Sequence, residues 1–135
     1  MRRLTLALVC SALAAMVSVG AVAGTATGAP VSVFRGTWTS IDTDGSSQRL
    51  DIAGSGRGAY GMTLVDDSAT AACGGQPARV VGPGVSDGNT LVMTAHLVCV
   101  PGGAVLKGST IGIEFVYSPA DDTLTDQFGV TWSRG

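Results

Sequence analysis

The clearest pattern in the chain is an alternation of side chains with a period of two. It predicts β-strands over Thr90–Cys99 and Thr110–Tyr117, each with one face turned to the interior. His96 falls on the opposite face of the first strand and is expected to meet solvent. The inward positions are predicted to be Leu91, Met93, Ala95, Leu97 and Cys99, and then Ile111, Ile113, Phe115 and Tyr117.

Six further segments rich in Val, Ile, Thr and aromatic residues predict further strands between turns made by Asp, Asn, Pro and Gly. One of them contains Pro77 and Pro83, which have no backbone N–H to donate to a neighbouring strand. That segment is therefore expected to be weak and to lie at an edge or in an irregular position. The six segments are Phe34–Thr43, Gln48–Ala53, Ala59–Asp66, Pro77–Val85, Asp122–Asp126 and Val130–Arg134.

The eight predicted strands follow each other closely, so neighbours in sequence are expected to pair. After residue 30, no stretch repeats Ala, Leu, Glu or Lys at helical spacing. An open sheet of this size would expose an apolar face and two edges, which closure removes. We therefore predict an all-β, antiparallel up-and-down barrel of about eight strands, and a two-sheet β-sandwich is the alternative.

The first 29 residues are typical of a secretory signal peptide. Arg2 and Arg3 precede an apolar stretch that ends in small residues, with cleavage expected between residues 23 and 29. This segment would form an N-terminal signal helix, and Cys10 would be lost with it. We expect a secreted, extracellular protein whose single β domain spans residues 30–135.

The predicted mature chain is mildly acidic. Its six Lys and Arg residues and ten Asp and Glu residues give a formal net charge of 6 − 10 = −4. Without a run of basic residues, it is not expected to bind nucleic acid or an anionic membrane surface.

Two cysteines remain after cleavage, Cys73 and Cys99, and an oxidising compartment favours a disulfide between them. The bond would close a loop of about 26 residues and contribute roughly 3.5 kcal/mol by the chain-entropy estimate. It would also fix the long connection Asp67–Gln76 to the end of the Thr90–Cys99 strand.

No residue pattern predicts catalysis, a cofactor or a metal site. His96 is the only histidine, and neither a nucleophile nor an orienting acid can be assigned to it. Acidic clusters occur at Asp42 and Asp44, at Asp66 and Asp67, and at Asp121, Asp122 and Asp126. Calcium is an alternative for these clusters, but Asp is also the residue that turns favour.

The Gly36-Thr37-Trp38 start of the first strand and Arg134 in the last strand resemble the calycin superfamily of lipocalin- and avidin-like barrels. The resemblance implies that Trp38 closes one end of a barrel while a basic side chain packs across its ring. A guanidinium group over an indole gains cation–π energy. We assign structural barrel closure to Gly36, Trp38, Trp132 and Arg134.

A second resemblance covers nearly the whole predicted mature chain. It is similar to a group of small secreted bacterial proteins that brings no known activity. The resemblance rests on Gly36–Trp38, Asp42–Ser46, the cysteine pair Cys73 and Cys99, Asp121–Asp126 and Trp132–Arg134.

These observations favour a non-catalytic binding module over an enzyme. Inside the barrel, apolar side chains either fill the space themselves or enclose a small apolar ligand. An extracellular protein-interaction or inhibitor domain is the alternative, acting through the loops Asp67–Gln76 and Pro101–Ser109. A small hydrolase that uses His96 or an aspartate is the third reading. The ligand, the partner and the oligomeric state are left open.

Overall fold

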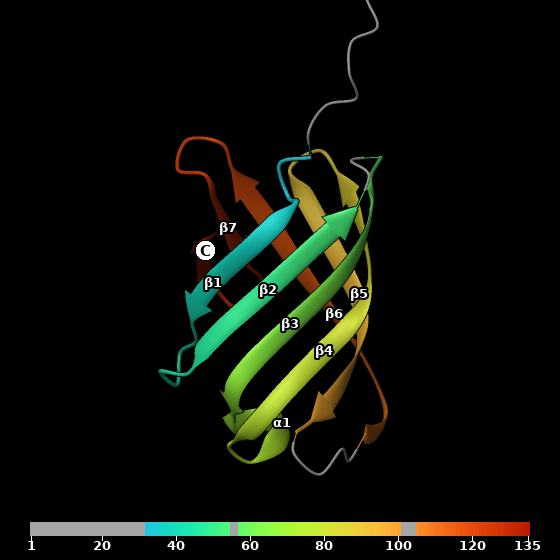
Figure 1. Ribbon diagram of the computed structural model, residues 1–135, viewed down its shortest axis with the longest axis vertical. Coiled ribbons are helices and arrows are strands. Elements are labelled where there is room, and N and C mark those ends of the chain that lie inside the picture. The colour runs from blue at the N-terminus through green and yellow to red at the C-terminus, as the bar shows by residue number, and fades with distance from the viewer. Residues whose placement is uncertain (1–31, 55–56, 101–104) are drawn as a thin grey trace, which may run out of the picture.

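A computed structural model describes residues 32–54, 57–100 and 105–135, the last range with side chains from residue 109 onward. Eight antiparallel strands form a closed barrel in the order of the sequence, which confirms the up-and-down barrel against the sandwich (Figure 1). The predicted signal peptide, residues 1–29, lies outside the described residues. The elements are β1 Gly36–Ile41, β2 Ser47–Gly54, β3 Ala59–Ala69, α1 Thr70–Cys73, β4 Gln76–Asp87, β5 Thr90–Cys99, β6 Val105–Ser118, β7 Thr123–Asp126 and β8 Thr131–Arg134.

The core lies inside the barrel, on the faces that the alternation predicts. In β5 the inward side chains are buried, whereas Thr94 and His96 are exposed on the outside. Burial of this kind contributes about 25 cal/mol for each Å² of apolar surface removed from water. The largest fully buried side chains are Trp38, Leu50, Met62, Leu91, Met93, Phe115, Leu124 and Trp132.

Three predicted boundaries are wrong. Phe34 lies outside β1, because a turn in which the Arg35 N–H donates to the Ser32 carbonyl carries the chain across the barrel end. The predicted loop 101–109 is shorter, since β6 begins at Val105, and its residues 101–104 lie outside the described part of the chain. The predicted connection 67–76 is largely absorbed by the end of β3, by α1 and by the start of β4.

Of the two positions expected for the proline-containing segment, the edge is wrong, because a closed barrel has no edge, whereas an irregularity in the strand pairing is present. Strand β4 spans 12 residues and pairs with both neighbours. Pairing with β5 is interrupted between Val81 and Gly84, and the donor-less Pro83 falls in this gap. Next to it, Gly82 allows close approach of β5, because a Cβ there would overlap the Thr94 carbonyl oxygen.

The first and last strands close the barrel along a short seam. Strands β1 and β8 pair only at Trp38 with Arg134 and at Thr39 with Ser133. One end of the barrel holds the segment before β1, and the other holds α1 (Figure 1). In the described part of the chain, no helix is long and apolar enough to cross a membrane.

Replacing Gly82 by Ala is expected to destabilise the barrel by about 3 kcal/mol, because β4 and β5 must separate to admit the methyl group. Urea unfolding measures the loss. Gly61→Ala in the neighbouring strand is the control, since a Cβ there meets nothing within 4 Å. Equal stability of the two variants would contradict this account of the β4–β5 approach.

Candidate functional site

One end of the barrel is closed by aromatic side chains around Phe34. The Phe34 ring contacts Tyr60 and Tyr117 edge to face, with ring centroids 6.0 and 6.1 Å away. The Tyr60 hydroxyl is hydrogen-bonded to the Ser32 hydroxyl at 2.6 Å, and the Trp38 indole N–H donates to the Phe34 carbonyl at 2.8 Å. The segment before β1 is thus held across this end from several sides.

Arg134 joins the segment before β1 to the end of β8. Its guanidinium carbon lies 4.2 Å from the centroid of the Trp38 ring, the arrangement expected from the sequence. Two of its nitrogens donate to the carbonyls of Arg35 and Val33, at 3.1 and 2.7 Å, and a third donates to Asp122 at 2.7 Å. A single side chain therefore links the first strand, the last strand and the β6–β7 turn.

The electrostatics of this end follow from the same contacts. The hydrogen bond from Arg134 lowers the pKa of the Asp122 carboxyl. The hydrogen bond between the Tyr117 hydroxyl and Asp122 raises the pKa of that tyrosine. Gly36 makes the approach possible, because its φ is +137° and a Cβ there would lie 3.2 Å from the Arg134 Nη1 atom.

The other half of the barrel contains a cavity of about 540 Å³ that is open at the end where α1 lies. Its volume is in the range typical of sites for small organic ligands. Asp42 and Asp44 of the β1–β2 turn and Phe128 of the β7–β8 turn line it at that end. Its apolar wall is formed by inward side chains that include Leu64, Val80, Leu97, Ile111, Ile113 and Trp132.

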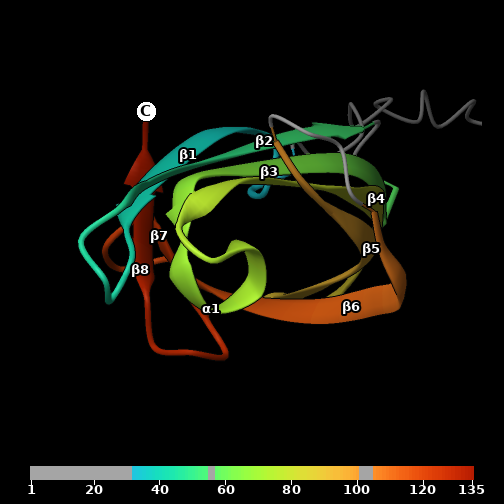
Figure 2. The same ribbon diagram turned by 90° about the horizontal axis from the view of Figure 1, so that it is seen from below.

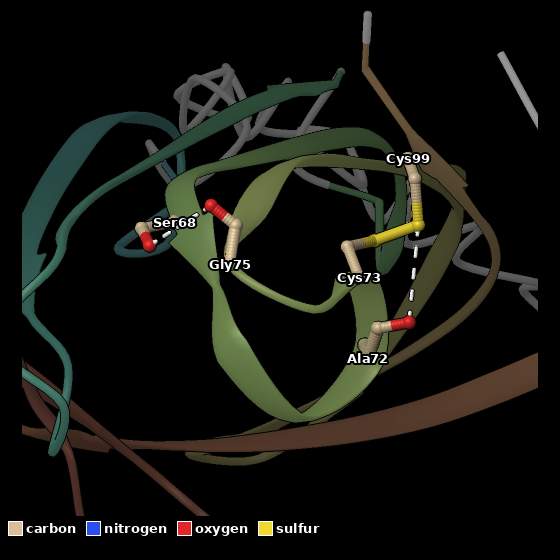
Figure 3. Close-up of a disulfide and its surroundings, with 5 residues drawn as sticks. All are labelled: Ser68, Ala72, Cys73, Gly75 and Cys99. Atoms are coloured by element: carbon tan, nitrogen blue, oxygen red, sulfur yellow. Dashed lines mark hydrogen bonds between the residues drawn. A yellow bond between two sulfur atoms is a disulfide. The ribbon is translucent and has the colours of Figure 1, made fainter. Parts of the chain in front are cut away.

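Helix α1 lies across part of the barrel opening (Figure 2). Its residues Thr70, Ala71 and Ala72 line the cavity. A disulfide joins Cys73, at its end, to Cys99 at the end of β5, as the sequence predicts, with 5.6 Å between the Cα atoms (Figure 3). The disulfide therefore attaches the end of the helix to β5, which is the neighbour of β4 in the barrel.

A hydrogen bond fixes the other end of α1 to the β1–β2 turn. The Thr70 hydroxyl donates to Asp44 Oδ2 at 2.6 Å, and the Ser46 N–H donates to Oδ1 at 3.0 Å. These hydrogen bonds, the one from Thr70 first, lower the pKa of Asp44 from 3.8 to about 2. Helix α1 thus bridges the cavity opening between the β1–β2 turn and β5.

The structure divides the residues assigned to barrel closure between the two ends. Gly36, Trp38 and Arg134 meet at the closed end, whereas Trp132 lies in the cavity wall. The Trp132 indole N–H donates to Asp126 Oδ2 at 3.1 Å. The two tryptophans are therefore in different halves of the barrel.

The other predicted candidates do not converge on one site. His96 is exposed on the outer face of β5 and is not among the residues that line the cavity. Asp42 and Asp44 accept hydrogen bonds from turn N–H groups, as turn-forming aspartates do. No three His, Cys, Asp or Glu residues of the described ranges lie close enough together to hold a metal ion.

Two members of the predicted acidic clusters are buried, a position that was not expected from the sequence. Asp66 and Asp126 line the cavity with exposed fractions of 7% and 9%. Each lies in phase with buried apolar residues of its strand, Asp66 with Leu64 and Asp126 with Leu124. That phase is visible in the sequence and would have identified both residues as inward-facing.

A second hollow lies on the outside, along β1, β2 and β8, where the seam pairing ends. It is an open groove, lined by Thr39, Ile41, Arg49, Asp51 and Ser133 among others. The buried Ser40 hydroxyl oxygen beside it has no hydrogen-bond partner among the described residues. The interior cavity is the more enclosed and the more apolar of the two hollows.

Comparisons with known proteins found no matching family model, no similar curated protein and no similar solved structure.

Arg134→Ala is expected to lower the free energy of unfolding by about 2–3 kcal/mol, because it removes charge-assisted hydrogen bonds to two carbonyls and the cation–π contact. Urea titration measures this change. The control is Arg49→Ala, which breaks the exposed pair with Asp51 and should cost less than about 1 kcal/mol. A loss for Arg134→Ala no larger than for Arg49→Ala would show that Arg134 does not hold this end.

Thr70→Val should raise the pKa of Asp44 from about 2 toward 3.8, because the largest cause of the depression is removed. A depressed carboxyl pKa means that the α1 contact stabilises the fold above pH 3.8 and is lost as the pH falls toward 2. NMR titration of the carboxyl carbon measures the shift. Ser68→Ala is the control, because the Ser68 hydroxyl donates to the Gly75 carbonyl and not to Asp44. It should leave the pKa of Asp44 unchanged.

Proposed function

We propose that this chain is a secreted, non-catalytic binding module that holds a small apolar ligand inside its barrel. The observation that supports it best is the cavity of about 540 Å³, whose walls are the apolar inner faces of several strands. Binding of an apolar ligand in a cavity of this size is favourable, because the ligand replaces water against apolar walls. The ligand enters at the α1 end, since the other end is filled by aromatic side chains.

The division of the interior supports this reading over a fully packed core. Trp38, Leu50 and Phe115 are not among the residues that line the cavity, and none of them has exposed surface. Empty volume in a core lowers the free energy of unfolding, so the half with the cavity contributes less to stability and the packed half contributes more. A cavity kept at that cost is better explained by an occupant than by chance.

Secretion has separate support. The Cys73–Cys99 disulfide is consistent with an oxidising, extracellular environment. The expected signal peptide leads to the same compartment. In such a setting a ligand must be captured from dilute solution, a task suited to a rigid, enclosed site.

The calycin-like reading remains part of this proposal. Its support is the contact of Arg134 with Trp38 beside Gly36, at the end of the barrel opposite the cavity opening. In this interpretation the end at Trp38 closes the ligand-binding cavity, and α1 partly covers the opening at the other end.

The proposal is tested by titrating the secreted protein with Nile red, a neutral apolar dye whose emission shifts to the blue in apolar surroundings. A saturable shift with one dye per chain is expected. Ala78→Phe should abolish it, because Ala78 lines the cavity and a phenyl ring there would occupy the space. Urea unfolding verifies that this variant folds.

The matched control is Ala53→Phe, which places the same ring on the exposed outer face of β2. It should bind the dye like the unchanged chain. Absence of saturable binding to the unchanged chain, or equal binding by the Ala78→Phe variant, would refute the cavity as the site. Native mass spectrometry of the protein from its own secretion then detects any small molecule it carries.

A further inference from the structure

The charges around the cavity are all of one sign among the described residues. Four carboxylates line it, Asp42, Asp44, Asp66 and Asp126, and no Lys or Arg does. Asp42 and Asp44 lie at the rim, whereas Asp66 and Asp126 belong to the buried polar residues of the interior. The described lining of the cavity is therefore apolar in its walls and carries only negative charges.

The hydrogen-bond partners of Asp66 in the described part of the chain are all neutral groups. Its Oδ1 accepts hydrogen bonds from the Ser46 hydroxyl at 2.9 Å and from the Ser68 N–H at 3.0 Å. Its Oδ2 accepts one from Gln48 Nε2 at 3.3 Å. A carboxylate has room for about four such bonds, so Oδ2 retains accepting capacity.

Asp126 is in the same situation. Its Oδ1 accepts hydrogen bonds from the N–H groups of Phe128 and Val130, at 2.9 and 3.0 Å, and its Oδ2 accepts the one from Trp132. The ion pairs found among the described residues, Arg49 with Asp51 and Arg134 with Asp122, lie elsewhere. A buried carboxylate without a cation beside it is costly, and a bound cation relieves that cost.

Other groups of the cavity also suit a cation that carries hydrogens. Gln48 lines the cavity. Its side-chain oxygen is buried and has no hydrogen-bond partner among the described residues. It can accept a bond from an incoming N–H group. The indole of Trp132 lines the wall, and Phe128 is 68% exposed at the opening. Aromatic faces attract ammonium groups by about 0.5–2 kcal/mol.

From this combination we infer that the ligand is a lipophilic primary amine, bound in its protonated form. Its ammonium group lies against Asp66 and the Gln48 oxygen, where it replaces water with charge-assisted hydrogen bonds. Its hydrocarbon part lies along the apolar wall formed by Leu64, Val80 and Ile113 among others. This inference rests on the proposed function, since it names the class of ligand for the same cavity.

Three probes with the same chain and different head groups test the inference on the unchanged protein. Decylamine, decanol and decanoate are titrated calorimetrically at pH 7, where the amine is protonated. Decylamine should bind at least tenfold more tightly than decanol, and decanoate should bind most weakly. If decanol or decanoate binds as tightly as the amine, the inference is wrong and the proposed function stands. If none of the three binds, the proposed function itself fails.

Asp66→Asn locates the head group. It should weaken decylamine binding about tenfold and leave decanol binding unchanged. Asp67→Asn is the matched control, because Asp67 is exposed and adjacent in the same strand and does not line the cavity. Equal effects of the two variants, or none from either, would overturn the assignment. The head-group comparison decides the amine inference even if Asp66→Asn does not fold.

A third variant addresses Lys107 of β6, whose side chain lies outside the described residues. Lys107→Gln removes a positive charge from the chain. Decylamine should bind to it as tightly as before or more tightly. Weaker binding would mean that a cation of the protein helps to hold the ligand, and it would overturn the inference.

Discussion

Arg134 lies where the first and last strands of the barrel meet, and its guanidinium group satisfies several demands at once. It covers the Trp38 ring, donates to the carbonyls of Val33 and Arg35, and pairs with Asp122. A planar group with five N–H donors can do this, whereas an ammonium group cannot match its geometry. Because the strand pairing at this seam is only two residue pairs long, the side chain supplies much of what the backbone ladder lacks.

Because the end at Phe34 is densely packed, the end at α1 can be packed less densely. Aromatic rings and the segment before β1 fill the first half of the interior, so the barrel does not depend on dense packing throughout. The second half can then hold a cavity and buried carboxylates, features that reduce stability in a small domain. Helix α1 is attached there by a disulfide on one side and a hydrogen bond on the other. In the function proposed above, stability and binding depend on different halves of the barrel.

Much of the fold follows from the period-two alternation, which identifies the strands and the inward residues of β5 and β6. The disulfide was expected because an exported chain keeps only two cysteines. The Arg134–Trp38 contact was implied by the resemblance to calycin barrels and not by the spacing of the residues. The cavity does not follow from the sequence, since its volume depends on how the side chains of many strands fit together at the end. The position of β4 inside the closed barrel was not predicted, because it depends on how β4 pairs with β5. Pro83 lies where that pairing is interrupted, beside Gly82. Asp66 was treated as a turn residue, although its phase with Leu64 indicates an inward position.

The short seam has a consequence for the order in which the chain folds. Every other pairing joins strands that follow each other, whereas the bond from Arg134 to the Arg35 carbonyl spans 99 positions. Hairpins form early because their loops are short, and the entropy of closing the longest loop is met last. Just before completion, β1 and β8 both present unpaired backbone groups, which are templates for pairing with another copy of the chain. The moment of greatest risk of aggregation is therefore the final step of folding.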